Sequence, residues 1–352
     1  MNNMKIVVVG GGSGGHIYPG LAVAEKLIED NDVHFVLGAK EIDKNIAKNF
    51  DQKIKVKHIN ALSFNKKYSF KKVKTWPKFF NFIFRLKMNT FSQLIFLKKN
   101  KIERIFATGG YVCVPVMIAG KLLRKKMFFH EQNVVLGLAG KVAKRLGVKI
   151  LYSWPTENAN VEVVGCPLKK EIQALVDESD ASLTTNQVVI FGGSNGSKEI
   201  NDYIAQNLNE ISKKTEMNLI NITGANEYSS IKPNAKKGYE VIEYSHDLPE
   251  LIAKAKFVVC RSGATTCFEL MALKKPALLL PLKSAGNNEQ VKNAQAMEKM
   301  GYGVKVNGET FLTQFLNFSN NEDSILDNIQ VSYSQHKFTN AVDEIVEIIQ
   351  KG

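Results

Sequence analysis

The chain has 352 residues, of which 44% are hydrophobic and 23% are charged. These proportions exclude an intrinsically disordered protein, and the length suits two globular domains. No apolar run reaches the about 18 residues that a membrane-spanning helix needs, so we expect no such helix. The four cysteines lack C-x-x-C spacing and no cleavable leader precedes the first apolar run, so we expect a reduced, cytoplasmic protein.

Apolar, β-branched runs alternate with amphipathic stretches along the whole chain. In the first half they predict helices near 18–29, 112–124 and 135–146, and strands near 4–9, 33–37, 53–59, 102–107, 127–130, 149–153 and 161–165. In the second half they predict helices near 199–213, 248–255, 264–274 and 288–300, and strands near 187–191, 218–223, 239–243, 257–260, 277–281 and 303–306. The alternation predicts an α/β fold with two doubly wound, mostly parallel sheets.

The transition between the two halves is expected between residues 155 and 168, near Gly165 and Pro167. A last helix is expected near 340–350, with Asn340 as its N-cap. This helix could pack back on the first domain through an apolar face made of Val342, Ile345, Val346 and Ile349.

Each half opens with the same local pattern, in which a β-branched strand runs into a glycine loop and then a helix. Residues 10–16 follow the strand at 6–9, and residues 192–197 follow the strand at 188–191. Such a loop offers backbone N–H groups and the positive end of a helix dipole, which together bind phosphate. Two such loops predict two domains that face each other across a cleft, an arrangement that suits an enzyme with two large substrates.

The net charge of +13 comes from one segment, residues 52–102, which has fourteen lysines and arginines, no acidic residue and eight of the twenty phenylalanines. Interleaved lysines and rings favour an anionic membrane surface. The same composition could bind single-stranded nucleic acid or form a core helix with solvated lysines. No nucleic-acid-binding motif accompanies it, so we expect a membrane partner and no nucleic acid. The membrane residues that we expect are Lys71, Lys72, Lys74, Trp76, Lys78, Phe79, Phe80 and Phe82.

The first glycine loop also contains the G-x-G-x-x-G pattern of dinucleotide-binding proteins, at Gly10, Gly12 and Gly15. The second strand, however, ends in residues 38–40 without an acid for the ribose, and the second loop lacks the Lys-Ser/Thr of a P-loop. We therefore expect no nicotinamide or flavin cofactor. The D-x-D at 30–32 is expected in a turn away from the ligand-binding edge, and the histidines lack zinc spacing, so we expect no metal.

The densest group of reactive residues follows the strand at 257–260 and opens a helix. Backbone N–H groups from Ala264 onward and the hydroxyls of Thr265 and Thr266 could hold a pyrophosphate. Glu269 lies one turn later, where its two oxygens could accept both ribose hydroxyls. An ordinary capped helix can carry the same residues, so this group alone does not decide the function.

Downstream, residues 287–294 begin another helix that is rich in amides, which suit sugar hydroxyls. Together with this helix, six motifs in chain order resemble the MurG family, the membrane-associated N-acetylglucosaminyltransferases of peptidoglycan synthesis. The motifs are Gly12-Ser13-Gly14-Gly15-His16, Thr108-Gly109-Gly110-Tyr111, His130-Glu131-Gln132-Asn133, Val164-Gly165-Cys166-Pro167, Gly192-Gly193-Ser194-Asn195-Gly196 and Cys260-Arg261-Ser262-Gly263-Ala264-Thr265-Thr266-Cys267-Phe268-Glu269.

The resemblance implies a GT-B fold of two Rossmann-like domains with the active site between them. It implies an inverting transfer of GlcNAc from UDP-GlcNAc to the C4 hydroxyl of MurNAc in undecaprenyl-pyrophosphoryl-MurNAc-pentapeptide (lipid I), giving lipid II. The expected location is peripheral, at the cytoplasmic face of the cell membrane. The expected domains are 1–160 for the acceptor and membrane, 161–335 for the donor, and 336–352 as the returning helix.

The resemblance also implies the site residues. Catalytic candidates are His16 and Glu131, and they stay alternatives: a histidine titrates near neutrality, whereas a glutamate needs burial to act as a base. Alternatively, His16 could only donate a hydrogen bond to a phosphate. Acceptor-binding residues are Gly14, Gly15, Thr108, Gly109, Gly110 and Tyr111. Donor-binding residues are Ser13, Gly14, Gly15, Asn133, Lys169, Ser194, Ser245, Ala264, Thr265, Thr266, Glu269, Gln290 and Asn293.

Within these implied roles, Ser194 and the start of the 264–274 helix bind the diphosphate, Ser245 reads uracil, and Gln290 with Asn293 binds the sugar. Lys169 stands where the family commonly has arginine, so its contacts could differ. A helix dipole with hydroxyl donors can stabilise the departing UDP without a metal. The alternatives are a UDP-GlcNAc 2-epimerase of the same fold, which needs no lipid acceptor, and a nucleic-acid-binding protein that uses residues 52–102.

Overall fold

The computed structural model describes residues 3–61, 76–156, 161–178, 185–193, 196–282, 288–335 and 341–352. The chain divides into two compact units, which are described separately. Unit 1 contains Met1–Lys169 and Asn340–Gly352, and unit 2 contains Lys170–Thr339. The boundary expected after residue 160 therefore falls inside unit 1, because the short strand β7 (Glu162–Val163) pairs with β6 (Lys149–Tyr152).

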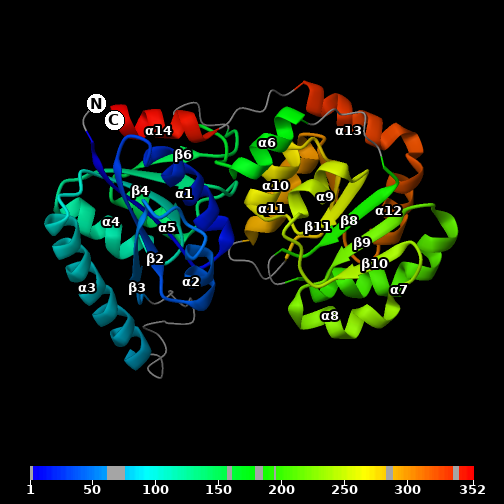
Figure 1. Ribbon diagram of the computed structural model, residues 1–352, viewed down its shortest axis with the longest axis horizontal. Coiled ribbons are helices and arrows are strands. Elements are labelled where there is room, and N and C mark those ends of the chain that lie inside the picture. The colour runs from blue at the N-terminus through cyan, green and yellow to red at the C-terminus, as the bar shows by residue number, and fades with distance from the viewer. Residues whose placement is uncertain are drawn as a thin grey trace. The chain divides into compact units, whose positions relative to one another are not determined.

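Unit 1 is built on a parallel sheet whose described strands follow the order β3-β2-β1-β4-β5-β6-β7 (Figure 1). The strands before β6 are β1 (Lys5–Gly10), β2 (Asp32–Gly38), β3 (Lys55–Ile59), β4 (Arg104–Gly109) and β5 (Lys126–Glu131). The helices are α1 (Gly14–Leu27), α2 (Glu41–Ala47), α3 (Trp76–Lys99), α4 (Cys113–Leu122), α5 (Leu138–Arg145) and α14 (Ala341–Lys351). Both ends of the chain lie in this unit (Figure 1).

Alternate residues of β1 serve two separate cores, as the two-residue period of a strand requires. Ile6 and Val8 pack in the cluster that includes α1 and α14, whereas Val7 and Val9 pack in the cluster that includes α3, α4 and α5. A strand that is buried on both faces is apolar throughout, which explains the uninterrupted β-branched run in the sequence. The apolar face of α14 is buried against the first of these clusters.

Unit 2 repeats the topology of unit 1 in the strand order β10-β9-β8-β11-β12-β13. Its strands are β8 (Gln187–Phe191), β9 (Asn218–Ile222), β10 (Tyr239–Ile242), β11 (Phe257–Cys260), β12 (Ala277–Leu279) and β13 (Gly303–Lys305). Its α-helices are α6 (Lys170–Glu178), α7 (Lys198–Lys214), α8 (Ala225–Ile231), α9 (Leu248–Lys254), α10 (Ala264–Ala272), α11 (Glu289–Lys299), α12 (Phe311–Asn320) and α13 (Ile325–Ser334). Short 3-10 helices cover Lys232–Asn234 and Glu322–Ser324. The prediction of two doubly wound parallel sheets is confirmed.

Two differences from the predicted elements bear on the site. Helix α1 begins at Gly14 and contains Pro19, whereas the sequence places its start near residue 18. Burial of Ile17 against the sheet outweighs the poor helix propensity of the two glycines before it. The second difference is a set of helices without a clear sequence signal, namely α2, α6, α8, α12 and α13. Within the described ranges, none of the helices combines the length and apolarity that a membrane crossing requires.

Candidate active site

Three neighbouring parallel strands, β1, β4 and β5, end at the same edge of the unit 1 sheet. The chain order reverses between β1 and β4, and ligands of doubly wound sheets bind outside the carboxyl ends of strands at such a point. The loops after these strands begin at Gly10, Gly109 and Glu131. The fold therefore gathers the first three of the predicted motifs at one edge.

The glycine loop after β1 is held by the protein itself. Gly12 N donates to Asp43 Oδ1 at 2.7 Å, and Gly11 N donates to the Gly109 carbonyl oxygen at 3.3 Å. These two N–H groups are therefore not offered to a phosphate. Ser13 is the N-cap of α1, yet its hydroxyl makes no capping hydrogen bond. The part of this loop that could bind an anion is thus limited to Ser13 and the first turn of α1.

Asp43 is a site residue that the sequence analysis does not identify. Its side chain is fully buried in the first turn of α2, and its Oδ2 has no hydrogen-bond partner among the described residues. Because its other oxygen accepts from Gly12, it holds the glycine loop against the sheet. The sequence shows an acidic residue soon after the glycine that ends β2. The same residue could simply stabilise the N-terminus of a helix, so the sequence does not single it out.

Thr108, Gly109 and Gly110 act through their backbone. The hydroxyl of Thr108, a residue predicted to bind the acceptor, is fully buried and donates to the His16 carbonyl oxygen at 2.6 Å. This hydrogen bond ties the end of β4 to α1. Gly110 has φ +85°, and a Cβ there would lie 2.0 Å from the Gly11 carbonyl oxygen. Only glycine allows the two loops to approach this closely.

Tyr111 follows these glycines and is half-buried. Burial raises the pKa of its hydroxyl to about 12, and the nearby Asp43 carboxylate adds to the rise. Lys40 Nζ lies 4.9 Å from the centroid of its ring, which is a cation–π distance. The Tyr111 hydroxyl therefore stays protonated and is able to donate a hydrogen bond at physiological pH.

Glu131 ends β5 and is almost completely buried. Its Oε1 accepts from Asn133 N and Asn133 Nδ2, both at 3.2 Å, and its Oε2 accepts from Gly137 N at 2.9 Å. Burial raises the pKa of Glu131, and these hydrogen bonds oppose the rise. Since both oxygens already accept from the loop that follows, the side chain fastens this loop to β5.

His16 lies in the first turn of α1 and is only partly buried. Its Nδ1 lies 3.3 Å from Gln132 Oε1. The backbone of Gly109 packs against the ring, since a Cβ there would lie 2.7 Å from Nδ1. Of the two catalytic candidates, His16 is therefore the accessible one. Lys169, a predicted donor-binding residue, has its Nζ 3.5 Å from the centroid of the Tyr18 ring.

In unit 2 the corresponding point lies between β8 and β11, which are paired and parallel. The loop after β8 leads to α7, whose N-cap Ser197 accepts a hydrogen bond from Ile200 N at 3.3 Å. Ser194, predicted to bind the diphosphate, lies outside the described residues. Arg261 follows β11 and donates to Glu199 Oε2 at 2.7 Å, which ties this loop to α7.

Helix α10 starts at Ala264, and its N-cap is Gly263, which has no side chain to cap the helix. Thr265, Thr266 and Glu269 are each partly exposed. The first turn thus carries two hydroxyls beside the positive end of the dipole, and a carboxylate stands one turn further along. This arrangement can bind a diphosphate that is joined to a diol.

The amides of α11 are engaged with the protein. Asn293, predicted to contact the sugar, is fully buried, and its Nδ2 donates to the Ser262 carbonyl oxygen at 3.1 Å. Gln290 Oε1 accepts from Leu282 N at 2.8 Å. Ser245 is partly exposed, and its Oγ accepts from Asp247 N at 3.2 Å. These contacts hold the loops around the first turn of α10.

No group of three or more His, Cys, Asp or Glu side chains that could hold a metal ion occurs within the described ranges. The Asp30–Asp32 triplet lies between the end of α1 and the start of β2, with Asp32 paired to Lys55 at 2.7 Å. It is thus at the amino end of a strand, away from the carboxyl edge that gathers the other motifs.

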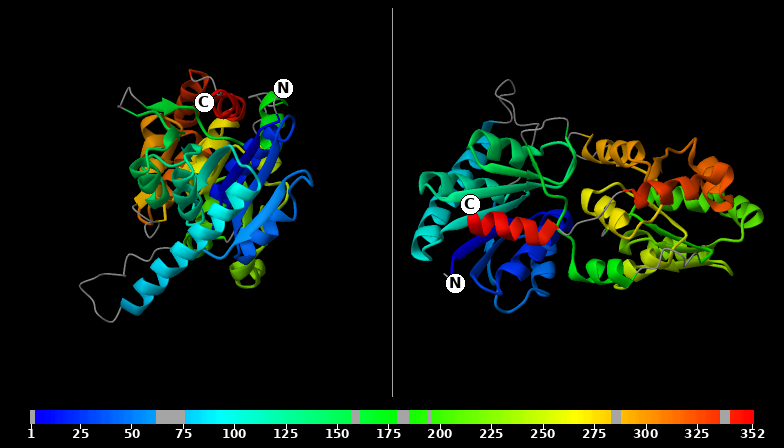
Figure 2. Two further views of the ribbon diagram at one scale, coloured as in Figure 1. Left: turned by 90° about the vertical axis from the view of Figure 1, so that its left-hand side faces the viewer. Right: turned by 90° about the horizontal axis from the view of Figure 1, so that it is seen from above.

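A second surface of unit 1 is the outer face of α3. Its buried residues, Thr90, Gln93 and Leu97, all lie in its second half, and Figure 2 shows the helix extending away from the sheet. Large apolar side chains between 41% and 63% exposed run along the helix at Trp76, Phe80, Phe84, Met88, Phe91 and Ile95. Of the predicted membrane residues, Lys78 is exposed, Phe79 and Phe82 are half-buried, and Lys71, Lys72 and Lys74 lie outside the described residues.

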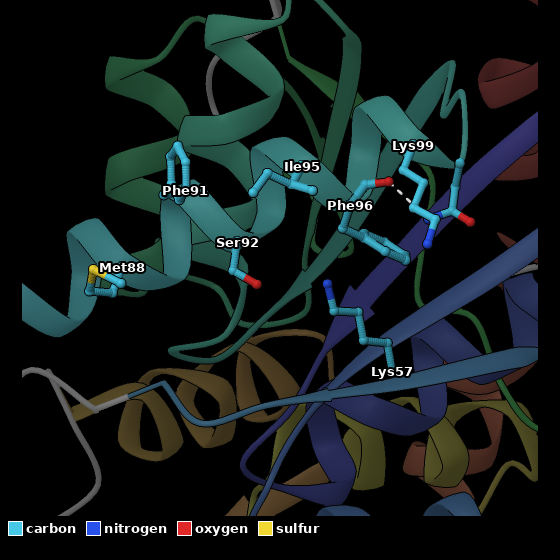
Figure 3. A pocket seen from close by; sticks show the side chains of 8 residues that line it. Lys57, Met88, Phe91, Ser92, Ile95, Phe96 and Lys99 are labelled. Atoms are coloured by element: carbon cyan, nitrogen blue, oxygen red, sulfur yellow. Dashed lines mark hydrogen bonds between the residues drawn. The ribbon is translucent and has the colours of Figure 1, made fainter.

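A shallow pocket opens on the same helix face, between α3 and β3 (Figure 3). Met88, Phe91 and Ile95 form its apolar side, while Lys57 and Lys99 bring amines to the other side. Lys57 Nζ lies 3.8 Å from the centroid of the Phe96 ring, and burial lowers the pKa of this amine to about 8. The face therefore combines exposed rings with cationic groups.

Comparison with known proteins identifies the family. The glycosyltransferase family 28 N-terminal domain matches residues 6–151, and the C-terminal domain of the same family matches residues 187–345. A UDP-N-acetylglucosamine–N-acetylmuramyl-(pentapeptide) pyrophosphoryl-undecaprenol N-acetylglucosamine transferase of Clostridium perfringens is 31% identical and covers 100% of this chain and 99% of its own. One from Bacillus thuringiensis is 33% identical and covers 85% of each chain.

Solved structures agree with this result. The crystal structure of Acinetobacter baumannii MurG superposes with a TM-score of 0.76 at 25% identity, covering 99% of this chain and 100% of its own. The glycosyltransferase of kitacinnamycin superposes with a TM-score of 0.73 at 10% identity, which supports the fold alone. The resemblance drawn from the motifs is therefore confirmed, and the chain belongs to the MurG family of N-acetylglucosaminyltransferases, with the GT-B fold of glycosyltransferase family 28.

Proposed function

We propose that this enzyme transfers GlcNAc from UDP-GlcNAc to the C4 hydroxyl of MurNAc in lipid I, which gives lipid II with inversion at the anomeric carbon. Similarity to MurG enzymes over the full length supports the proposal. The observation that carries it is the chemistry at the two sheet edges: an accessible histidine in the first turn of α1, and two hydroxyls with a carboxylate in the first turns of α10.

His16 is the proposed base. It accepts the proton of the C4 hydroxyl as that oxygen forms its bond to C1 of GlcNAc, and the bond from C1 to the UDP oxygen breaks with its electron pair leaving on UDP. Glu131 is a poorer candidate, because both of its oxygens accept hydrogen bonds from the loop after β5. Its proposed role is to hold this loop, and Asn133, which lies in the loop, is proposed to contact the donor.

Unit 2 is the proposed donor domain. The first turn of α10, with the Thr265 and Thr266 hydroxyls, faces the diphosphate, and Glu269 accepts from both ribose hydroxyls. As the bond to C1 breaks, negative charge builds up on the UDP oxygens, and the dipole and hydroxyls stabilise it. Ser194 and the backbone near Ser245 are proposed to contact diphosphate and uracil respectively. Gln290 retains a proposed sugar contact through its amide nitrogen.

Unit 1 is the proposed acceptor domain. The pyrophosphate of lipid I is proposed to bind at Ser13, Gly14 and Gly15, where the helix dipole of α1 is positive and the Ser13 hydroxyl has no capping role. Gly109 and Gly110 supply backbone groups beside it, and Tyr111 supplies a protonated hydroxyl. The lipid-linked substrate is therefore proposed to bind beside His16.

The apolar face of α3 is the proposed membrane contact, at the cytoplasmic surface of the cell membrane. Rings along one helix face enter the headgroup boundary, and amines beside them attract anionic lipids. Among the predicted rings, exposure favours Trp76 and Phe80 over Phe79 and Phe82. Exposure also adds Phe84 and Phe91 to the proposed contact.

Vesicle binding tests the membrane contact. A ring variant with Phe80, Phe84 and Phe91 changed to Ser should lose retention at every salt concentration. A charge variant with Lys78, Arg85 and Lys87 changed to Gln should lose roughly 1 kcal/mol per charge, chiefly at low salt. Val331→Ser and Lys213→Gln, exposed in unit 2, are matched controls. Unchanged vesicle binding, or tighter binding to oligonucleotides at the same salt, would refute the membrane role.

The reaction itself is tested with UDP-GlcNAc and a short-chain, water-soluble lipid I analogue. We expect a disaccharide product and stoichiometric UDP, and neither in the absence of the acceptor. An epimerase would instead consume UDP-GlcNAc without the acceptor and release the 2-epimer. The ring variant of α3 should retain full activity on this soluble acceptor, since it alters only the membrane surface.

A further inference from the structure

A chain of hydrogen bonds runs from His16 into the interior of unit 1. His16 Nδ1 lies 3.3 Å from Gln132 Oε1, and Gln132 Nε2 lies 3.0 Å from His130 Nδ1. At the far end, His130 Nε2 lies 2.8 Å from the Gly165 carbonyl oxygen and 3.1 Å from Ser153 Oγ. Gln132 and His130 are both buried, so water does not compete for the contact between them.

The orientation of the Gln132 amide follows from its second contact. Gln132 Nε2 also donates to the carbonyl oxygen of His130 at 3.1 Å. A carbonyl oxygen only accepts, so the amide nitrogen must face it and the amide oxygen must face His16. The backbone of Gln132 is held as well, because Trp154 Nε1 donates to its carbonyl oxygen at 2.8 Å.

His130 fixes the other end of the chain. Its Nε2 faces the Gly165 carbonyl oxygen and therefore carries the hydrogen, while its Nδ1 accepts from the Gln132 amide. Burial lowers the pKa of His130 to about 4, so the ring stays neutral at physiological pH. A hydrogen on Nδ1 of His130 would clash with the amide hydrogens of Gln132. Each hydrogen bond from His16 to Gly165 therefore has one fixed donor and one fixed acceptor.

We propose that Gln132 is a positioning residue that sets the tautomer of His16. Nδ1 of His16 carries the hydrogen and donates to Gln132 Oε1, which leaves the lone pair of Nε2 to accept a proton. The inference rests on the proposed role of His16 as base. During the reaction the proton of the C4 hydroxyl goes to Nε2, and the positive charge that spreads to Nδ1 strengthens the hydrogen bond to the amide oxygen.

The tautomer can be read directly in the unaltered enzyme. Long-range proton–nitrogen NMR of the full chain, labelled with ¹⁵N-histidine and studied where imidazoles are neutral, separates protonated from unprotonated ring nitrogens. The His16 signals are identified by their loss in His16→Gln. We expect a hydrogen-bearing Nδ1 and a bare Nε2. The opposite assignment would overturn the proposal without any change at Gln132.

Two variants then test the cause. Gln132→Met removes the acceptor at similar size and should give a mixture of tautomers, a kcat lower by about tenfold to a hundredfold, and an unchanged KM for UDP-GlcNAc. Gln132→Glu removes the amide donor to His130 but keeps an oxygen facing Nδ1 of His16, so the hydrogen should stay on this nitrogen. Gln187→Met, the same change at a partly buried glutamine of unit 2, should alter neither quantity.

The outcomes separate this inference from the proposed function. If Gln132→Met keeps a hydrogen-bearing Nδ1, packing against Gly109 alone sets the tautomer and the inference is wrong. If the tautomer changes while kcat does not, the role of Gln132 stands and His16 is not the base. A fall in kcat together with the tautomer change supports both.

Discussion

The two sheet edges share one topology and differ in how their polar groups are used. At the unit 1 edge, Thr108, Glu131 and Gln132 are buried and bind other protein groups, and the accessible imidazole of His16 stands at the end of that network. At the unit 2 edge, Thr265, Thr266 and Glu269 remain partly exposed in the first turns of α10. The same strand order can therefore carry buried polar side chains that bind the protein in one unit and partly exposed polar side chains in the other.

We expect the largest loss of activity from a substitution at His16. Replacing it by Gln removes the base while keeping a polar side chain, so kcat should fall by about 10²- to 10⁴-fold. UDP affinity should not change, because UDP is proposed to bind at unit 2. Steady-state kinetics with the soluble acceptor and calorimetry with UDP measure the two quantities. A larger loss in Glu131→Gln than in His16→Gln would assign the base to Glu131.

The second effect concerns the other edge. Glu269→Ala removes the proposed acceptor of two ribose hydroxyls, and UDP binding should weaken by about 2–3 kcal/mol, the scale of hydrogen bonds to a charged group. Glu240→Ala, at an exposed glutamate on β10 of the same unit, is the matched control. Calorimetric titration with UDP measures both. Equal affinity in Glu269→Ala and in the control would remove Glu269 from the donor site.

These two predictions rest on features that the sequence reveals to different degrees. Strands such as β1 and β8 were predictable because strands buried on both faces appear as uninterrupted apolar runs. Helices α2 and α8, with seven residues each, were not, since short helices are stabilised mainly by tertiary packing. The motifs that gather at each edge could be expected from the rule that carboxyl ends of parallel strands lie together.

The direction of each side chain could not be predicted. Nothing local indicates that Asp43 reaches Gly12 or that the Thr108 hydroxyl turns inward to the His16 carbonyl oxygen, because both contacts join segments far apart in the chain. The same is true of Asn293, whose amide faces Ser262. A motif therefore predicts which residues meet at an edge, and the structure is needed to tell which of them bind the protein.

A third prediction concerns how the stability of unit 1 depends on pH through the buried side chain of His130. Burial lowers the pKa of His130 from 6.5 to about 4 in the folded state. The free energy of unfolding therefore keeps its full contribution from the neutral ring above pH 6.5. That contribution decreases as the pH falls from 6.5 toward 4, because the unfolded chain binds a proton that the folded chain does not. Between pH 7 and 5 the loss is about 2 kcal/mol. Urea unfolding followed by tryptophan fluorescence measures unit 1, because both tryptophans, Trp76 and Trp154, lie there.

The matched variant for this measurement is His130→Asn. It should be less stable than the parent chain at pH 7, because the contact with Gly165 is altered, and it should lose less stability between pH 7 and 5. Parallel pH dependences for the two proteins would show that folding does not lower the pKa of His130.

The smallest expected effect is that of chelation. If the dipole and hydroxyls of α10 stabilise the departing UDP, EDTA should leave most of the activity intact. If EDTA abolishes the activity and magnesium or manganese restores it, the departing UDP needs a cation. The dipole and hydroxyls of α10 would then not be sufficient to stabilise it.

The position of α14 has a consequence for the order of folding. This helix belongs to unit 1 and buries Ala341, Val342, Ile345, Val346 and Ile349 in the cluster that contains α1, yet it follows all of unit 2 in the chain. During synthesis from the N-terminus, the unit that begins first is therefore completed last. Until the ribosome has released the final helix, the cluster that contains α1 lacks part of its cover, and the nascent first unit exposes an apolar surface to chaperones or to other chains.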